Sequence, residues 1–86
     1  MKFVWDENAW SEYVQWQSLD RKVVRRIHIL LTDISGNGND GIGKPAAFKH
    51  EFQGYWSRRI THEHRLIYTI VGDEVRIAAC RYHYGD

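Results

Sequence analysis

The stretch YWSRRITHEHRLIY, residues 55–68, decides how this chain folds. Three arginines, two histidines and a glutamate are interspersed here with β-branched and aromatic residues. This mixture is typical of strands that pack on one face and carry charge on the other. We therefore expect two strands, Tyr55–Thr61 and His64–Val71, with charged side chains gathered on one face of a sheet.

The two adjacent arginines of this stretch point to opposite faces if the strand is regular. Arg59 then shares a face with Ser57 and Thr61, beside their hydroxyl groups. Arg58 shares the face of Trp56 and packs its aliphatic stem there. Of the two cations, only Arg59 is expected to face a polar site.

Further strands are expected on both sides of this stretch. Downstream, Glu74–Tyr84 follows the tight turn Gly72-Asp73, so it forms a hairpin with the strand before it. Upstream, Ala47–Phe52 reads as a strand that turns at Gln53-Gly54. These strands bring the end of the chain next to the charged stretch.

The first part of the chain reads as a short strand and a helix. Lys2 to Trp5 is the strand, and Asp6 is suited to cap a helix that ends near Ser18. The helix has one apolar side, which we expect to be core: Ala9, Trp10, Tyr13, Val14 and Trp16.

A second helix is expected to start at the cap residue Asp20 and to be followed by a glycine-rich loop, Ser35–Gly43. Its apolar arc holds Val23, Val24, Ile27, Leu30, Leu31 and Ile34. Its opposite arc is basic, with Arg21, Lys22, Arg25 and Arg26. This basic stripe is either a solvated face or a contact for nucleic-acid phosphates.

The element order predicts an α+β fold. Two N-terminal helices pack on a mostly antiparallel sheet in the order β-α-α-β-β-β-β. A chain of 86 residues forms one domain, residues 1–86, with a modest core. It has no apolar run long enough to span a bilayer and no secretory signal at its start, so we expect a cytoplasmic protein without membrane contact.

The charges are unevenly distributed. The formal net charge is only +1, yet residues 44–65 hold five basic residues against two acidic ones. Lys44 and Lys49 precede the charged stretch, and His83 lies near the end of the last strand. Local clustering of this kind indicates an anionic partner.

Cysteine and histidine often act as nucleophiles or metal ligands, but we predict neither role for Cys80, His62 or His64. Cys80 lies in an apolar run and reads as a small buried hydrophobe rather than a nucleophile. His62 and His64 have the spacing of a metal pair, but no cluster of cysteine or aspartate completes a ligand shell. We expect neither a metal nor a cofactor.

The strings GIGKP, FKH, GYWSRRIT, EHRLIY and ACRYHY together resemble the YoeB/Txe branch of the RelE superfamily. The resemblance extends over nearly the whole chain. It implies a RelE-like fold and a bacterial type II toxin that cleaves messenger RNA on the translating ribosome. The implied partners are a cognate antitoxin, the 70S ribosome with its mRNA and, because the family often dimerises, a second copy of the chain.

The resemblance also implies a metal-independent cleavage in which the ribose 2′-hydroxyl attacks the phosphorus and leaves a 2′,3′-cyclic phosphate. Such chemistry needs a base, cations and an acid. By the family's motif, Arg65 stabilises the phosphate, and His83 is the acid with Tyr84 beside it. Lys49, Arg59 and Lys44 bind the substrate, Glu63 orients its neighbours, and the basic stripe of the second helix is assigned to ribosomal phosphates.

One position departs from the family. The general base is a glutamate in the segment after Lys44-Pro45, and here that position is Ala46. Loss of a positioned base lowers a rate by roughly 10²–10⁴. Three explanations stay open: a detoxifying replacement, a natural residue with the base role moved to Glu51, His50 or His83, or a degenerate toxin that no longer cuts. The alternative function is thus a silent ribosome-, RNA- or antitoxin-binding protein.

Overall fold

The computed structural model describes residues 1–48 and 53–83. The elements come in the expected order and confirm the α+β class. They are β1 (Lys2–Trp5), α1 (Glu7–Leu19), α2 (Arg21–Asn37), β2 (Ala46–Ala47), β3 (Trp56–Arg59), β4 (His64–Val71) and β5 (Glu74–His83).

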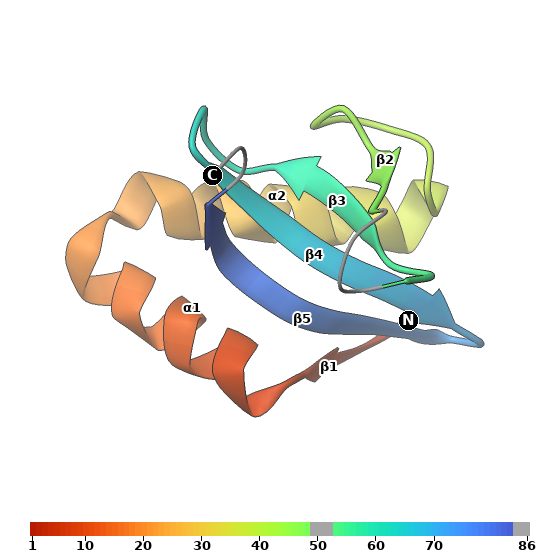
Figure 1. Cartoon of the computed structure of the whole chain (residues 1–86), viewed down its shortest axis with the longest axis horizontal. Helices are drawn as coiled ribbons and strands as arrows, with labels where there is room; N and C mark the ends of the chain where they lie inside the picture. The colour runs from red at the N-terminus through yellow and green to blue at the C-terminus, as the bar shows by residue number, and fades with distance from the viewer. Residues whose placement is uncertain (49–52, 84–86) are drawn as a thin grey trace.

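The five strands form one sheet in the order β1-β5-β4-β3-β2. β1 runs parallel to β5, and the other neighbours are antiparallel. The expected hairpin joins β4 to β5 through Gly72, whose φ of 60° suits a residue without a Cβ atom. Figure 1 shows β4 and β5 at the centre of the sheet, with α2 behind it and α1 beside β5.

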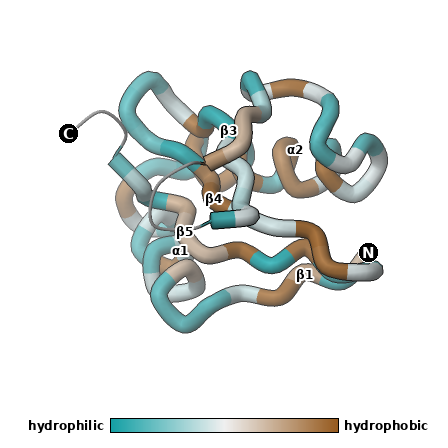
Figure 2. The backbone as a smooth tube through the Cα atoms, turned by 45° about the vertical axis from the view of Figure 1, so that its right-hand side comes forward, coloured by the Kyte–Doolittle hydropathy of each residue, from teal (hydrophilic) through white to brown (hydrophobic). Residues whose placement is uncertain are grey.

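The two faces of the sheet carry different clusters. The helices cover one face, where the larger cluster includes Ile27 and Ile34 of α2 with Leu66, Tyr68 and Ile77 of the sheet. In Figure 2 the hydrophobic segments run along these strands. A smaller cluster lies on the other face, which no helix covers in the described part of the chain: Phe48, Ile67, Ala78 and Ala79, with Tyr55 and Tyr82 against them. We call this the open face.

α1 is attached to the end of β5 by hydrogen bonds as well as by packing. The indole Nε1 of Trp16 donates to the carbonyl of Cys80 at 2.9 Å. The carboxylate of Glu12 accepts the backbone N–H groups of Cys80 (2.8 Å) and Arg81 (3.1 Å). The first helix therefore fixes the strand end that leads to His83.

The apolar side predicted for α1 is only partly core. Ala9 and Trp16 are buried, but Trp10 is 50% exposed and Val14 is 47% exposed. Residues 9 and 16 are two turns apart, so the covered stripe is narrow and follows β5. Trp10 instead contacts Trp5 and Tyr13 at the rim, with ring centroids 5.7 and 5.4 Å away.

Three element boundaries differ from those predicted. α2 continues to Asn37 instead of giving way to a loop at Ser35, because the amide of Asn37 donates to Asp33 one turn earlier at 2.8 Å. β3 ends at Arg59, since the hydroxyl of Thr61 accepts the backbone N–H groups of Glu63 and His64 and turns the chain. β2 is two residues long, and residues 49–52 of the predicted strand lie outside the described part.

Candidate active site

Two arginines lie directly opposite one another on the open face. Arg59 of β3 is in register with Arg65 of β4, and the side chain of Arg65 is buried. Like charges directly across a strand pair repel. The Nε atom of Arg59 is also buried and has no hydrogen-bond partner among the described residues. We call these residues the arginine pair; an anion between them would relieve the repulsion.

Position 46 lies on the same face. Ala46 of β2 is in register with Ser57 of β3, and residues that oppose one another in a sheet share a face. Ser57 is two residues before Arg59, so it also points to the open face. Ala46 is exposed, which leaves room for a longer side chain, but its methyl group cannot accept a proton.

His83 lies at the end of β5 on the side of the sheet that α1 covers, not on the open face with the arginine pair. It is in register with His64, whereas Tyr82 is in register with Arg65. Its Nε2 lies 3.3 Å from the carboxylate of Glu63, and both side chains are substantially exposed. The structure thus brings Arg59, Arg65 and residue 46 to one face and places His83 with Glu63 at the adjoining strand ends.

A series of edge-on ring contacts runs from α1 to His83, and one guanidinium lies against its first ring. The guanidinium of Arg81 lies 5.3 Å from the ring of Trp16, Trp16 meets His64 edge-on at 5.1 Å, and His64 meets His83 at 5.8 Å. The sequence drew attention to His64 only as half of a possible metal pair. Its role as a neighbour of His83 depends on strand register, which sequence spacing does not reveal.

The basic stripe of α2 divides into two parts. Arg21, Lys22 and Arg25 are exposed, and a shallow hollow of about 350 Å³ lies beside Arg21 and Arg25. Arg26 instead turns to the sheet, where its Nη2 donates to the carbonyl of Arg59 at 3.3 Å. Three of the four cations can therefore meet a partner, and the fourth supports β3.

Lys44 is exposed on the approach to β2, with a φ of 52°. Lys49 and Tyr84, which the family motif places in the site, lie outside the described residues. The same holds for His50 and Glu51, the alternative bases.

Arg58 is the basic residue whose surroundings the sequence predicted least well. Alternation puts it on the face of Trp56, as expected, but it is fully buried and pairs with Asp33 of α2. Burial disfavours its charge, yet hydrogen bonds to Asp33 and Tyr68 outweigh this and raise the pKa of Arg58. The same bond from Arg58, with help from Asn37, lowers the pKa of the Asp33 carboxyl.

Cys80 is confirmed as a buried small hydrophobe. Its Sγ lies 3.5 Å from the carbonyl of Ala9. Burial, with the nearby charge of Glu12, raises the pKa of the thiol to about 12. A thiol in this state is a poor nucleophile and a poor metal ligand.

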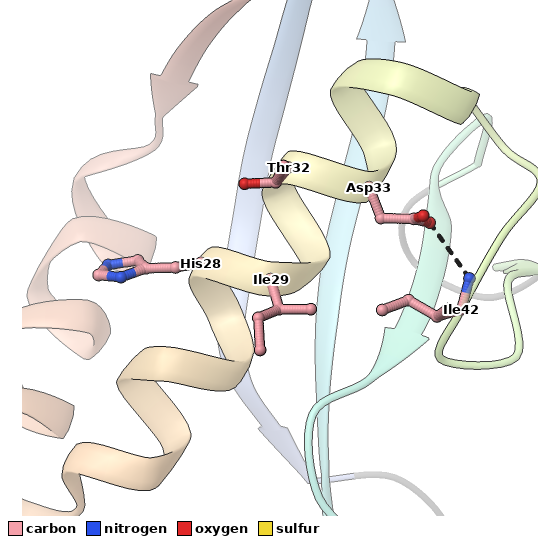
Figure 3. Close-up of a pocket in the computed structure, with 5 residues that line it drawn as sticks. All are labelled: His28, Ile29, Thr32, Asp33 and Ile42. Carbon is pink, nitrogen blue, oxygen red and sulfur yellow. Dashed lines mark hydrogen bonds between the residues drawn. The ribbon is translucent and has the colours of Figure 1, made fainter.

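One cavity is lined by residues of α2 and of the loop before β2 rather than by the arginine pair. It has a volume of about 380 Å³ and none of the predicted site residues lines it. Figure 3 shows its lining on the outer side of α2: His28, Ile29, Thr32, Asp33 and Ile42. Among the residues described, no three His, Cys, Asp or Glu side chains are grouped to hold a metal ion. No helix in the described ranges is long and apolar enough to cross a membrane.

Comparison with known proteins gives consistent matches. Residues 5–84 match the family described as the YoeB-like toxin of bacterial type II toxin–antitoxin systems. Toxin YoeB of Escherichia coli K12 is 48% identical over 84 residues, which cover 98% of this chain and all of that protein. Two Staphylococcus aureus structures, a YoeB dimer and a heterotetrameric YoeB–YefM toxin–antitoxin complex, each match at 44% identity over 98% of both chains, with TM-scores of 0.92 and 0.89.

Proposed function

Because the chain belongs to the YoeB-like toxins of bacterial type II toxin–antitoxin systems, we propose that it is a ribosome-dependent endoribonuclease that cuts mRNA in the A site, weakened by alanine at position 46. The observation that carries this proposal is the arginine pair on the open face. Two arginines in register on neighbouring strands, one of them with a buried Nε that has no hydrogen-bond partner among the described residues, suit the oxygens of a phosphodiester.

The proposed reaction needs no metal. The ribose 2′-oxygen attacks the adjacent phosphorus while its proton passes to water, or to a glutamate where position 46 carries one. The bond from phosphorus to the 5′-oxygen breaks, and the 5′-oxygen takes up a proton. Products are a 2′,3′-cyclic phosphate and a free 5′-hydroxyl. Arg59 and Arg65 stabilise the charge that builds on the phosphoryl oxygens. His83, held beside Glu63, supplies the proton to the leaving oxygen.

Position 46 is where the base is missing. A glutamate there would extend from β2 over Ser57 on the face that carries Arg59. Since a positioned base contributes roughly 10²–10⁴ in rate, the chain as it stands should be slow rather than unable to bind its target.

The paired test compares the chain with Ala46→Glu in a translating extract, with mRNA 5′ ends mapped by primer extension. Ala47→Glu is the matched control, because this neighbouring exposed residue adds the same charge but pairs with Trp56 on the other face. We expect strong A-site cleavage from Ala46→Glu only. Equal cleavage by the chain and both variants would assign the proton transfer elsewhere, and silence from all three would remove the catalytic proposal.

The second candidate function is binding without catalysis, and Ala46 is the observation that favours it. In that case the chain binds 70S ribosomes, and Ala46→Glu binds equally well but cuts nothing. Co-sedimentation with 70S ribosomes measures this binding. Arg65→Gln in that assay separates specific from loose association, since the arginine pair is the proposed phosphate contact. The exposed cations Arg21, Lys22 and Arg25 are the further candidates for ribosomal RNA.

A cognate antitoxin is the proposed protein partner. An acidic segment of it would bind the arginine pair in place of RNA and would neutralise the toxin by occupying the site directly. The Staphylococcus aureus relative was solved in a heterotetrameric complex with its antitoxin YefM. Loss of affinity on Arg59→Gln and Arg65→Gln, measured by calorimetry, would support this; unchanged affinity would place the antitoxin elsewhere.

We also propose that the chain forms a homodimer, as a relative does. The supporting feature is a hollow of about 350 Å³ beside exposed apolar residues, among them Phe3 at 41% and Trp10 at 50%. Light scattering should then give a dimer that Trp10→Lys converts to a monomer. Val14→Lys is the control, because Val14 is equally exposed on the same helix but does not line the hollow.

A further inference from the structure

The loop before β2 is wrapped around a buried cation. Arg58 is fully buried, and its Nη1 donates to the carbonyl of Ile42 at 3.0 Å. Its Nη2 donates to the carbonyl of Gly38 at 2.6 Å, with that of Asp40 at 3.5 Å. Three carbonyl groups of one short loop therefore converge on a single guanidinium.

Two further side chains complete this arrangement. The carboxylate of Asp33 pairs with Arg58 and also accepts the backbone N–H of Ile42 at 3.1 Å (Figure 3). The hydroxyl of Tyr68 accepts from Nε of Arg58 at 3.2 Å and donates to the side chain of Asn39 at 3.0 Å. α2, the loop, β3 and β4 are thus joined through Arg58. We call Arg58, Asp33 and Tyr68 the loop clamp.

The loop is shaped to fit closely over the clamp. Gly41 has a φ of 146°, and a Cβ atom there would overlap the carboxylate of Asp33. Gly43 has a φ of 80°, and a Cβ atom there would press on Leu30. The carbonyl of Gly43 also accepts the N–H of Arg59 at 2.7 Å. Only glycine allows so close an approach in this backbone conformation.

Residue 46 comes three positions after Gly43, in a strand of two residues. A pairing this short is too weak to hold its own place in a sheet. We propose that the loop clamp positions β2, so that Arg58 and Asp33 set where residue 46 stands relative to Ser57 and the arginine pair. They are positioning residues, and they touch no substrate.

This inference rests on the proposed function in one respect, the role of residue 46 as the site of the base. The geometry itself can be tested independently of activity. The contrasting interpretation is that Arg58 only stabilises the whole fold. The two interpretations differ in where the protein loosens when the clamp is broken.

The experiment uses Arg58→Met and the milder Asp33→Asn, each in the chain and in Ala46→Glu. Amide hydrogen exchange is followed by NMR at Ile42 and Arg59, whose N–H groups bond Asp33 and Gly43, and at Leu66 and Cys80 in the core. We expect exchange at the first two to rise by about tenfold or more with little change at the last two, because local opening leaves the core paired.

Arg76→Met is the matched control, since it removes an arginine that pairs with a carboxylate, Glu74, on the exposed far end of β5. It should leave all four amides unchanged. In the Ala46→Glu background the clamp variants should lower kcat by about tenfold with KM nearly unchanged, because residue 46 acts in the transition state.

Exchange that rises equally at all four amides, or at none, overturns the inference. If Arg58→Met does not fold, Asp33→Asn decides by the same criteria. Inactive Ala46→Glu with localised exchange would refute the proposed function but leave the positioning of β2 established. Active Ala46→Glu whose kcat is insensitive to both clamp variants would refute the positioning role.

Discussion

At the scale of single residues, Asp33 makes stability depend on pH. The bond from Arg58 holds the pKa of this carboxyl below its ordinary value of 3.8. A folded pKa below the unfolded one stabilises the fold fully above the unfolded value, and this contribution disappears as the pH falls through the folded value. Urea unfolding should therefore show the native chain losing stability below about pH 4 more steeply than Asp33→Asn.

At neutral pH the same variant should already be less stable, because it weakens the pair with a fully buried guanidinium. Losing the charge of Asp33 leaves the buried guanidinium of Arg58 without its ionic partner, so Asp33→Asn should unfold at a lower urea concentration than the native chain at pH 7. Parallel pH profiles for the two chains would show that Asp33 does not titrate with folding.

Cys80 should be inert in the folded chain. With a pKa of about 12, almost none of its thiol is ionised near neutral pH, and it is fully buried. Mass spectrometry after iodoacetamide treatment at about pH 8 should find no adduct on the native chain and one adduct on the chain unfolded in guanidinium. Rapid native labelling would mean that the end of β5 separates from α1.

Alternation along the stretch 55–68 was enough to assign Arg59 and Arg58 to opposite faces, as the structure has them. It could not supply the partner of Arg58, because Asp33 is 25 residues away and their meeting depends on how α2 crosses the sheet. The family motif named Arg65 and residue 46, which the register brings to the face of Arg59. The placement of His83 beside Glu63 depends on how the strand ends meet in the folded chain, which no rule of sequence spacing predicts.

At the scale of elements, the two helix starts offer a controlled comparison. Asp20 occupies the N-cap of α2 and accepts the N–H of Lys22 at 2.9 Å, whereas Asp6 occupies the N-cap of α1 without a side-chain bond. Asp20→Ala should therefore lower the free energy of unfolding by about 1 kcal/mol, and Asp6→Ala by clearly less. Thermal unfolding followed by circular dichroism measures both; equal losses would contradict the capping assignment.

Helix and strand types were predictable because the periodicity is strong, but their limits were not. Two glycines, Gly36 and Gly38, suggested a loop, yet the side chains of Asp33 and Asn37 bond across one turn and the helix passes Gly36. In α1 the period of 3.6 assigned Ala9 and Trp16 to the core correctly, but it wrongly assigned Trp10 and Val14 there as well. It could not show that β5 covers only Ala9 and Trp16 and leaves Trp10 at the rim.

At the scale of the whole molecule, β1 closes one edge of the sheet. The N–H groups of Lys2 and Asp6 donate to Asp73 and Ile77, so by alternation Val4 also donates toward β5 while Phe3 donates outward. Val4→Pro should lower the free energy of global unfolding by about 1–3 kcal/mol, since a buried carbonyl of β5 loses its donor. Phe3→Pro is the control in chemical denaturation and should have the smaller effect.

The pairing of β1 with β5 joins the two ends of the chain. Lys2 is in register with Glu74, and Glu12 bonds the backbone of Cys80 and Arg81. Contacts so distant in sequence cannot form during synthesis while the last strand is still inside the ribosomal exit tunnel. The sheet is completed only once residues 74–83 have left the exit tunnel, and Arg65 gains its β5 neighbour Tyr82 at the same time. A chain built this way has almost all of its fold outside the tunnel before its candidate site can take shape.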